Sequence, residues 1–194
     1  VSQAKLQLLG SAMEEVRQEF EPLQQLPDDN TPLPDVEYLS RWFPKGNLEF
    51  LRRAIAGIRR MKSEVGRNGA MVALSSVLRE ASWQDPQQLR VGRRSDTNIP
   101  NLSDLFYAAL DDIVKELTAI QSIPDLRWRR IPKLGSEVVL GDARKLSTIL
   151  RRHVRRQVDA VVTSPPYASA LPYIDTDRLS LRAFGLLPEG SQRV

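Results

Sequence analysis

The chain has 194 residues, enough for one domain or for a domain with an elaboration, and no run is long and apolar enough to span a bilayer. It holds no cysteine, which excludes a disulfide framework and thiolate metal sites and is consistent with a reducing cytoplasm. A formal net charge of +4 and a pI of about 9.6 favour a partner that carries phosphate.

The first two thirds of the chain have helical patterns. Apolar residues at helical spacing predict a first helix with the face Leu6, Leu9, Met13, Val16 and Phe20. Prolines between residues 22 and 34 predict an extended connection, after which Trp42 and Phe43 are expected to anchor the core. Helices are predicted over residues 47–65, with Asn47 as N-cap, and over residues 68–81, with residues 66–69 joining them.

Residues 85–100 are polar and predict a loop, and Asn101 or Ser103 can then cap a long helix that reaches about residue 122. After Pro124 the pattern changes. Short strands are predicted over residues 137–140 and 158–163, with a crossover helix over 143–157 between them and a final helix over 177–186. The expected fold class is therefore α/β, with a mainly helical segment over residues 1–130 and a Rossmann-like core over residues 131–194.

The most informative motif follows the second predicted strand. The run Val158-Asp159-Ala160-Val161-Val162 is typical of a buried parallel strand, and it leads directly into Thr163-Ser164-Pro165-Pro166-Tyr167. Two prolines stop the strand and fix two φ angles, which predicts a rigid turn at a sheet's carboxyl edge, where ligands bind in open α/β sheets. A hydroxyl, proline carbonyls and an aromatic ring there suit a flat, hydrogen-bonding substrate such as a nucleobase.

The Ser164-Pro165-Pro166-Tyr167 sequence resembles the catalytic motif of the DNA amino-methyltransferases, which methylate exocyclic amines of cytosine or adenine. The resemblance covers about residues 134–187, because Leu140-Gly141-Asp142 lies upstream at the usual spacing and Leu171-Pro172-Tyr173-Ile174 lies downstream. A Thr-Ser pair before the prolines is commoner in the cytosine-N4 branch than in the adenine-N6 branch. The resemblance implies a partial Rossmann-like fold that uses S-adenosylmethionine, in the setting of restriction–modification or defence.

The resemblance also implies roles for individual residues. The Ser164 hydroxyl and the Pro165 carbonyl would accept hydrogen bonds from the target amine and favour its pyramidal, nucleophilic form. Pro166 would stiffen the turn, and Tyr167 would stack on a base rotated out of the duplex. Asp142 and Thr163 would lie in the cofactor pocket. Tyr173 would lie near the DNA.

For three features of the sequence, a structural interpretation stands beside the functional one. Asp142 can equally be a helix N-cap, and both roles are compatible. The arginines of residues 144–156, with the single histidine His153 among them, are typical of a solvated helix face. Arg127-Trp128-Arg129-Arg130 suits a phosphate track, but it can equally be a linker anchored by its tryptophan.

A methyltransferase also needs a glycine-rich turn that lets the backbone approach the cofactor, and no such turn is found in these 194 residues. The chain is therefore expected to be a piece of a longer enzyme, with DNA and an N-terminal cofactor-binding segment as partners. In isolation it is expected to be inactive. Asp142 and Ser164 should emerge at one sheet edge, from strands that are not direct ladder neighbours.

Three functions remain from the sequence. The leading one is the catalytic-motif segment of an S-adenosylmethionine-dependent DNA amino-methyltransferase, with cytosine-N4 preferred over adenine-N6 as the target. The second is a helical DNA-recognition module on a catalytically inactive methyltransferase-like scaffold. The third is a non-catalytic helical interaction protein in which Ser164-Pro165-Pro166-Tyr167 is incidental.

Overall fold

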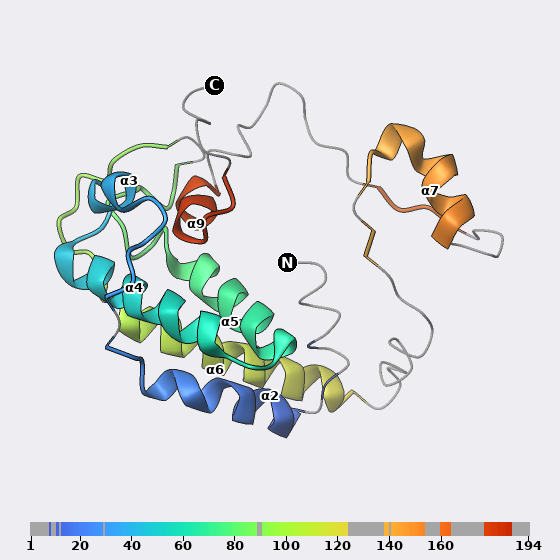
Figure 1. The fold of residues 1–194 in the computed structure, drawn as a ribbon, viewed down its shortest axis with the longest axis horizontal. Helices are drawn as coiled ribbons and strands as arrows, with labels where there is room; N and C mark the ends of the chain where they lie inside the picture. The colour runs from blue at the N-terminus through green and yellow to red at the C-terminus, as the bar shows by residue number, and fades with distance from the viewer. Residues whose placement is uncertain are drawn as a thin grey trace.

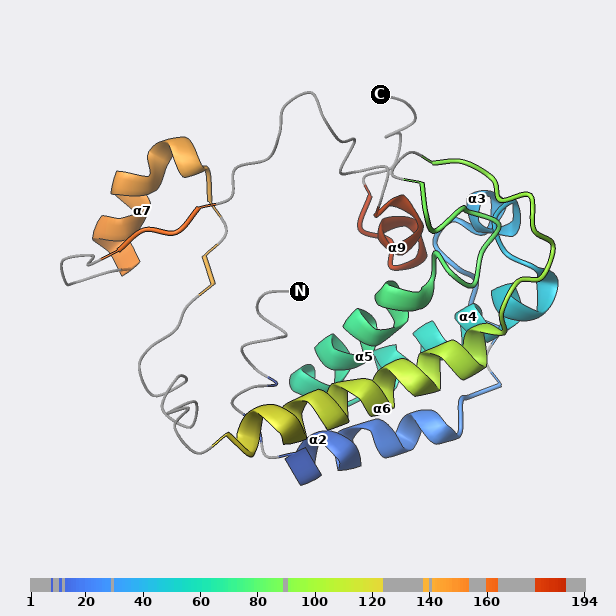
Figure 2. The ribbon, with the colours of Figure 1, turned by 180° about the vertical axis from the view of Figure 1, so that it is seen from behind.

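The computed structural model describes residues 8, 11, 13–28, 30–88, 91–123, 138–139, 141–153, 160–163 and 177–187. The elements of its N-terminal part are α2 (Met13–Phe20), the 3-10 helix η1 (Glu21–Gln24), α3 (Val36–Ser40), α4 (Lys45–Arg60), α5 (Glu64–Val77) and α6 (Leu102–Gln121). The 3-10 helix η4 (Ala143–Lys145), α7 (Leu146–His153) and α9 (Arg178–Ala183) follow. Figures 1 and 2 show a bundle of α2, α4, α5 and α6, with α3 and α9 at one end.

The bundle is held together by apolar side chains at helical spacing. Helix α6 contacts α2, α4 and α5, and Phe106 near its N-terminus is fully buried. Phe50 packs edge-on against both Phe106 and Tyr107, with ring centroids 6.0 Å apart in each pair. Other fully buried side chains come from every part of the bundle, namely Val16, Leu23, Leu39, Leu51, Leu74, Leu78 and Leu102.

The two predicted aromatic anchors lie where the sequence places them. Phe43 is buried, and Trp42 is partly buried and packs against the core. The prediction of core anchors is confirmed for both residues.

Local capping decides where several helices begin. The Asn101 side chain accepts a hydrogen bond from Ser103 N (3.1 Å), which confirms one of the two predicted caps of α6. Ser63 caps α5 through Gly66 N (3.2 Å), so this helix begins four residues before the predicted start. The prediction that residues 66–69 join two helices is wrong, because Gly66 and Gly69 lie inside α5.

A close approach explains the glycine at position 69. A Cβ there would lie 3.1 Å from the tip of the Phe20 ring, so glycine lets α2 pack tightly on α5. The helix propensity lost at this position is offset by that packing.

Asn47 is not the N-cap that its position in the sequence predicts. Pro44 is the N-cap of α4, and Asn47 is buried within the first turn. Its side-chain amide donates to Ala81 O (2.9 Å) and Pro100 O (2.9 Å), and its Oδ1 accepts from Leu102 N (3.0 Å). One amide therefore joins the start of α4 to the end of the α5 segment and to the start of α6.

The polar segment after α5 is irregular, as predicted, and arginines tie its two sides together. Gln84 and Arg93 form an isolated antiparallel bridge. The Arg94 guanidinium donates to Gln84 O (3.2 Å) and Glu80 O (2.8 Å), and Arg79 donates to Asp85 O (2.9 Å). We refer to residues 82–88 and 91–98 as the bridged loop.

The predicted α/β fold class is wrong for the part of the chain that the structure describes. Every regular element in the described residues is a helix. The isolated bridge between Gln84 and Arg93 is the β-pairing found among these residues. Val138 and Val139, and residues 160–163, lie in the predicted strands but are irregular and exposed. A strand needs a hydrogen-bonding neighbour, and none of the described segments pairs with either run. No partial Rossmann-like core is therefore present in the described residues.

The two C-terminal helices differ in their contact with the bundle. Helix α7 lies apart from the bundle in both views, next to η4 (Figures 1 and 2). It spans part of the predicted crossover helix, of which residues 154–157 lie outside the described residues. Helix α9 instead packs at the end of the bundle against α3, and its Leu179 and Ala183 belong to the common core.

Candidate functional site

The junction between α9 and the bundle is the best-defined structure near the predicted catalytic motif, because α9 begins eleven positions after Tyr167 (178 − 167). Leu179 and Ala183 are buried, and the Ser75 hydroxyl of α5 is hydrogen-bonded to the Ser180 hydroxyl (2.7 Å). This end of the motif segment is therefore anchored to the helical body.

A Schellman motif ends α9 at Ala183, three residues before the predicted end. Gly185 has φ +70°, Gly185 N donates to Arg182 O (3.2 Å), and Leu186 N donates to Leu181 O (2.7 Å). A Cβ at Gly185 would lie 3.2 Å from the Pro34 ring, so the turn also packs against the segment before α3. Glycine is needed here both for its backbone angle and for its size.

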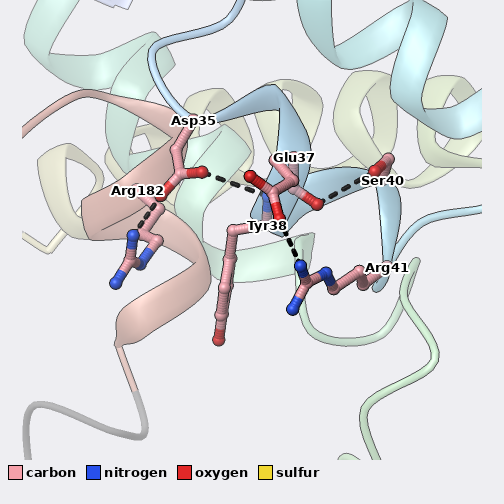
Figure 3. Close-up of polar contacts among 6 residues, drawn as sticks. All are labelled: Asp35, Glu37, Tyr38, Ser40, Arg41 and Arg182. Carbon is pink, nitrogen blue, oxygen red and sulfur yellow. Dashed lines mark hydrogen bonds and ion pairs between the residues drawn. The ribbon is translucent and has the colours of Figure 1, made fainter. Parts of the chain in front are cut away.

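Polar contacts complete the junction (Figure 3). Asp35 caps α3 through Tyr38 N (3.1 Å), and its other carboxylate oxygen pairs with the Arg182 guanidinium of α9. The same guanidinium lies over the Tyr38 ring, 4.6 Å from its centroid. Both charged side chains are largely shielded, since Arg182 is 16% exposed and Asp35 27%.

The electrostatics of Asp35 reflect this environment. Partial burial by itself would raise the pKa of its carboxyl group. The Arg182 and Tyr38 hydrogen bonds, with the charges of Arg182 and Arg41, outweigh that cost and hold the pKa below its usual value. The ionised pair is therefore the stable form at neutral pH.

Asp142 stands directly before η4 and behaves as a cap. Its Oδ1 accepts a hydrogen bond from Arg144 N (3.0 Å), and the Arg144 guanidinium donates to both carboxylate oxygens at 2.7 to 3.1 Å. The pKa of Asp142 is lowered mainly by the side-chain hydrogen bonds from Arg144, and to a smaller extent by the hydrogen bond from the Arg144 backbone N–H. The capping interpretation of Asp142 is thus confirmed, while a cofactor role for Asp142 stays a prediction.

The two predicted cofactor residues, Asp142 and Thr163, both lie in the part of the chain that the structure describes. The Asp142 carboxylate forms an ion pair with the Arg144 guanidinium, and Thr163 is exposed. Gly141 is exposed, and a Cβ there would meet only the end of the Ile149 side chain.

Most of the predicted site lies outside the described residues. This holds for Ser164, Pro165, Pro166 and Tyr167, for Tyr173, and for the basic run 127–130. Of the basic face predicted on the crossover helix, Arg144, Lys145 and Arg151 are exposed, as is His153, which agrees with a solvated face. A hollow of about 460 Å³ between α2 and α6 is lined by none of the predicted site residues.

A second group of side chains at this end of the bundle was not predicted from the sequence. Arg93 of the bridged loop lies over the Trp83 ring, 5.7 Å from its centroid, and donates to Arg41 O (2.9 Å). The composition of residues 79–94, with four arginines and a tryptophan, was the available signal. No sequence pattern linked these residues to α3 or to α9.

Comparison with known proteins adds no assignment: no family model, no curated protein and no solved structure matches this chain. Among the described helices, none is both long enough and apolar enough to cross a membrane.

Proposed function

We propose that this chain is the catalytic-motif segment of a DNA amino-methyltransferase, with the N4 amine of cytosine as its preferred target. The sequence Thr163-Ser164-Pro165-Pro166-Tyr167, with Gly141-Asp142 upstream, carries the proposal. The anchoring of α9 supports it, because a catalytic turn requires a fixed support and α9 ties one end of the motif segment to a packed core.

In this proposal the motif acts on the amine and not through a covalent intermediate. The exocyclic amine is a weak nucleophile because its lone pair is delocalised into the ring. Acceptors at Ser164 and Pro165 would draw its N–H groups out of the ring plane, and Tyr167 would hold the extrahelical base by stacking. A chain without cysteine is compatible with such direct transfer.

S-adenosylmethionine is the methyl donor that the resemblance implies. The 194 residues contain no glycine-rich turn, and Asp142 is already paired with Arg144. We therefore propose that a further polypeptide segment supplies the cofactor site. Calorimetric titration of this chain with S-adenosylmethionine is expected to give no measurable heat of binding, and micromolar affinity would contradict this division.

The test of function is base analysis of DNA methylated by the complete gene product that contains this chain. Mass spectrometry of nucleosides should detect N4-methylcytosine. Tyr167→Ala should lower the rate about 5- to 150-fold, because base stacking is worth about 1–3 kcal/mol, and Tyr167→Phe should keep most of the activity. Detection of N6-methyladenine instead would show that the enzyme methylates adenine and not cytosine. Wild-type activity in Tyr167→Ala, or no methylated base at all, would overturn the proposal.

A DNA-binding module on an inactive scaffold is the second candidate. The helical body and the absence of a sheet in the described ranges favour it, since DNA recognition needs no strand. DNA binding without any methylated base would select this function.

A further inference from the structure

Aromatic rings and arginines from three separate parts of the chain meet at one end of the bundle. They come from α3 and the residues just after it, from the bridged loop, and from α9. We call this surface the arginine–aromatic face and define it as Tyr38, Arg41, Trp42, Trp83, Arg93 and Arg182.

Direct contacts join these residues into one continuous surface. Arg182 lies over Tyr38, and the Tyr38 ring is 6.4 Å from the Trp42 ring. Trp83 N donates to Trp42 O (2.7 Å), which brings the bridged loop against the end of α3. Arg93 lies over the Trp83 ring and donates a hydrogen bond to Arg41 O, so it joins the bridged loop to the residue that follows α3. Figure 3 shows the Arg182 and Arg41 side chains on either side of Tyr38.

The face carries more positive than negative charge. Arg182 is paired with Asp35, and Arg41 with the exposed Glu37. Arg93 instead donates to a main-chain carbonyl, as do Arg79 and Arg94 behind it, and no carboxylate of the described residues forms an ion pair with these three. A carbonyl orients a guanidinium without cancelling its charge, so the charge of the exposed Arg93 remains available for an anionic partner. The Glu37–Arg41 pair is exposed and therefore weak, so a phosphate can take the place of Glu37 beside Arg41.

Exposure decides which groups can meet that partner. Arg41 is 68% exposed and Arg93 is exposed, while Trp83 is half-buried beneath the Arg93 guanidinium. An arginine that lies over an indole and is hydrogen-bonded to a carbonyl is restrained, so it loses less entropy when it binds phosphate. Aromatic and basic groups interleaved in this way are typical of surfaces that follow a nucleic-acid backbone.

We propose that the arginine–aromatic face binds the phosphodiester backbone of DNA, with Arg41 and Arg93 as the phosphate contacts and Trp83 as the support of Arg93. The inference rests on the proposed function and names a surface of this chain that would hold its substrate. Eleven residues lead from Tyr167 to α9, and this length of chain spans at most about 40 Å. This reach is slightly more than one helical turn of DNA, so the face and the motif can contact the same duplex.

The experiment measures fluorescence anisotropy of a labelled DNA duplex, about two helical turns long, titrated with this chain without cofactor. The double variant Arg41→Gln/Arg93→Gln should weaken binding about tenfold. It should also reduce the slope of log affinity against log salt by about 2, because two phosphate contacts are lost. Arg93→Lys keeps the charge and should retain most of the affinity.

The matched control removes two positive charges elsewhere. Arg17 of α2 and Arg59 near the end of α4 are exposed and lie away from the face, and Arg17→Gln/Arg59→Gln should leave the salt slope close to wild type. Circular dichroism of both double variants checks that each is folded. Equal losses in the two double variants, an unchanged slope in Arg41→Gln/Arg93→Gln, or tighter binding of an RNA duplex of the same sequence would each overturn the proposal.

The outcomes for the face and for the function are separable. If the complete gene product methylates DNA but the Arg41→Gln/Arg93→Gln variant binds DNA like wild type, the face is refuted and the function stands. If that variant loses affinity and no methylated base is found, the face stands and the methyltransferase function fails.

Discussion

Arg182 in α9 and Asp35 at the start of α3 form an ion pair across 147 positions of the chain. The pair closes the C-terminal part of the described chain onto the N-terminal bundle, and it does so next to the arginine–aromatic face. It therefore connects the end of the predicted catalytic segment with the proposed DNA-binding surface.

Replacing Asp35 with asparagine tests the strength of this connection. Asparagine caps a helix as well as aspartate does, so Asp35→Asn removes the charge and keeps the cap of α3. We expect a loss of about 1 kcal/mol in the free energy of unfolding, between the values of exposed and buried pairs. Urea denaturation measures it, with Glu37→Gln as the control, because the Glu37–Arg41 pair is exposed and should cost less. A larger loss in the control would contradict the assignment.

The same pair predicts a pH dependence. Because the pKa of Asp35 is lowered in the folded state, its contribution to stability is fully present above the unfolded pKa of about 4. It is lost as the pH falls through the folded pKa. The difference in melting temperature between wild type and Asp35→Asn should therefore be constant from about pH 5 to 7 and shrink below about pH 4. A difference that grows toward acidic pH would be inconsistent with an ionised Asp35.

Asn47 should be among the most sensitive polar positions. Asn47→Ala removes three hydrogen bonds and leaves Ala81 O, Pro100 O and Leu102 N without this partner in a buried site. We expect a loss of about 2–3 kcal/mol in unfolding free energy, measured by urea denaturation. Asn98→Ala, at an exposed position, is the control and should change stability by less than about 0.5 kcal/mol.

Two glycines should respond in opposite directions to alanine. Gly46 lies in α4, and a Cβ added to it would meet nothing within 4 Å, so Gly46→Ala should stabilise the protein by about 0.5 kcal/mol. Gly185→Ala should destabilise it by about 1 kcal/mol, because its φ of +70° is unfavourable for alanine and Pro34 lies close. Thermal unfolding of the two variants provides the measurement, and stabilisation by Gly185→Ala would argue against the Schellman turn.

The exposed valines after α7 predict self-association. Val161 is 69% exposed and Val162 98%, and adjacent exposed apolar side chains favour contact with a second molecule. Sedimentation velocity should show an average mass that rises with concentration, and Val161→Thr/Val162→Thr should reduce it. Val36→Thr, at a single exposed valine of α3, should have no such effect. A wild-type chain that stays monomeric at all concentrations would refute this prediction.

Two predicted helix caps, Asn101 and Asn47, show which features of the fold can be predicted from the sequence. The predicted helix capped by Asn101 is present as α6, because its hydrogen bonds join residues four apart and its cap is local. The same kind of pattern predicts a cap at Asn47, yet Asn47 is a buried connector, because its partners lie 34 to 55 residues away. Of the predicted site, only Asp142 and Thr163 lie within the described residues, and no pattern predicts the arrangement of Arg41, Trp83 and Arg93.

The sequence by itself determined the long helices α4 and α6, since a 3.6-residue apolar period is a property of one segment, but it did not predict α3 or the start of α5. It also determined the positive charge and the presence of the Ser164-Pro165-Pro166-Tyr167 motif. Only the tertiary structure decided that residues 160–163 form no strand with any other described segment, because a strand is stable only when another segment supplies its hydrogen bonds. It likewise decided that α9 closes on α3, because Arg182 and Asp35 become neighbours only after the bundle has packed.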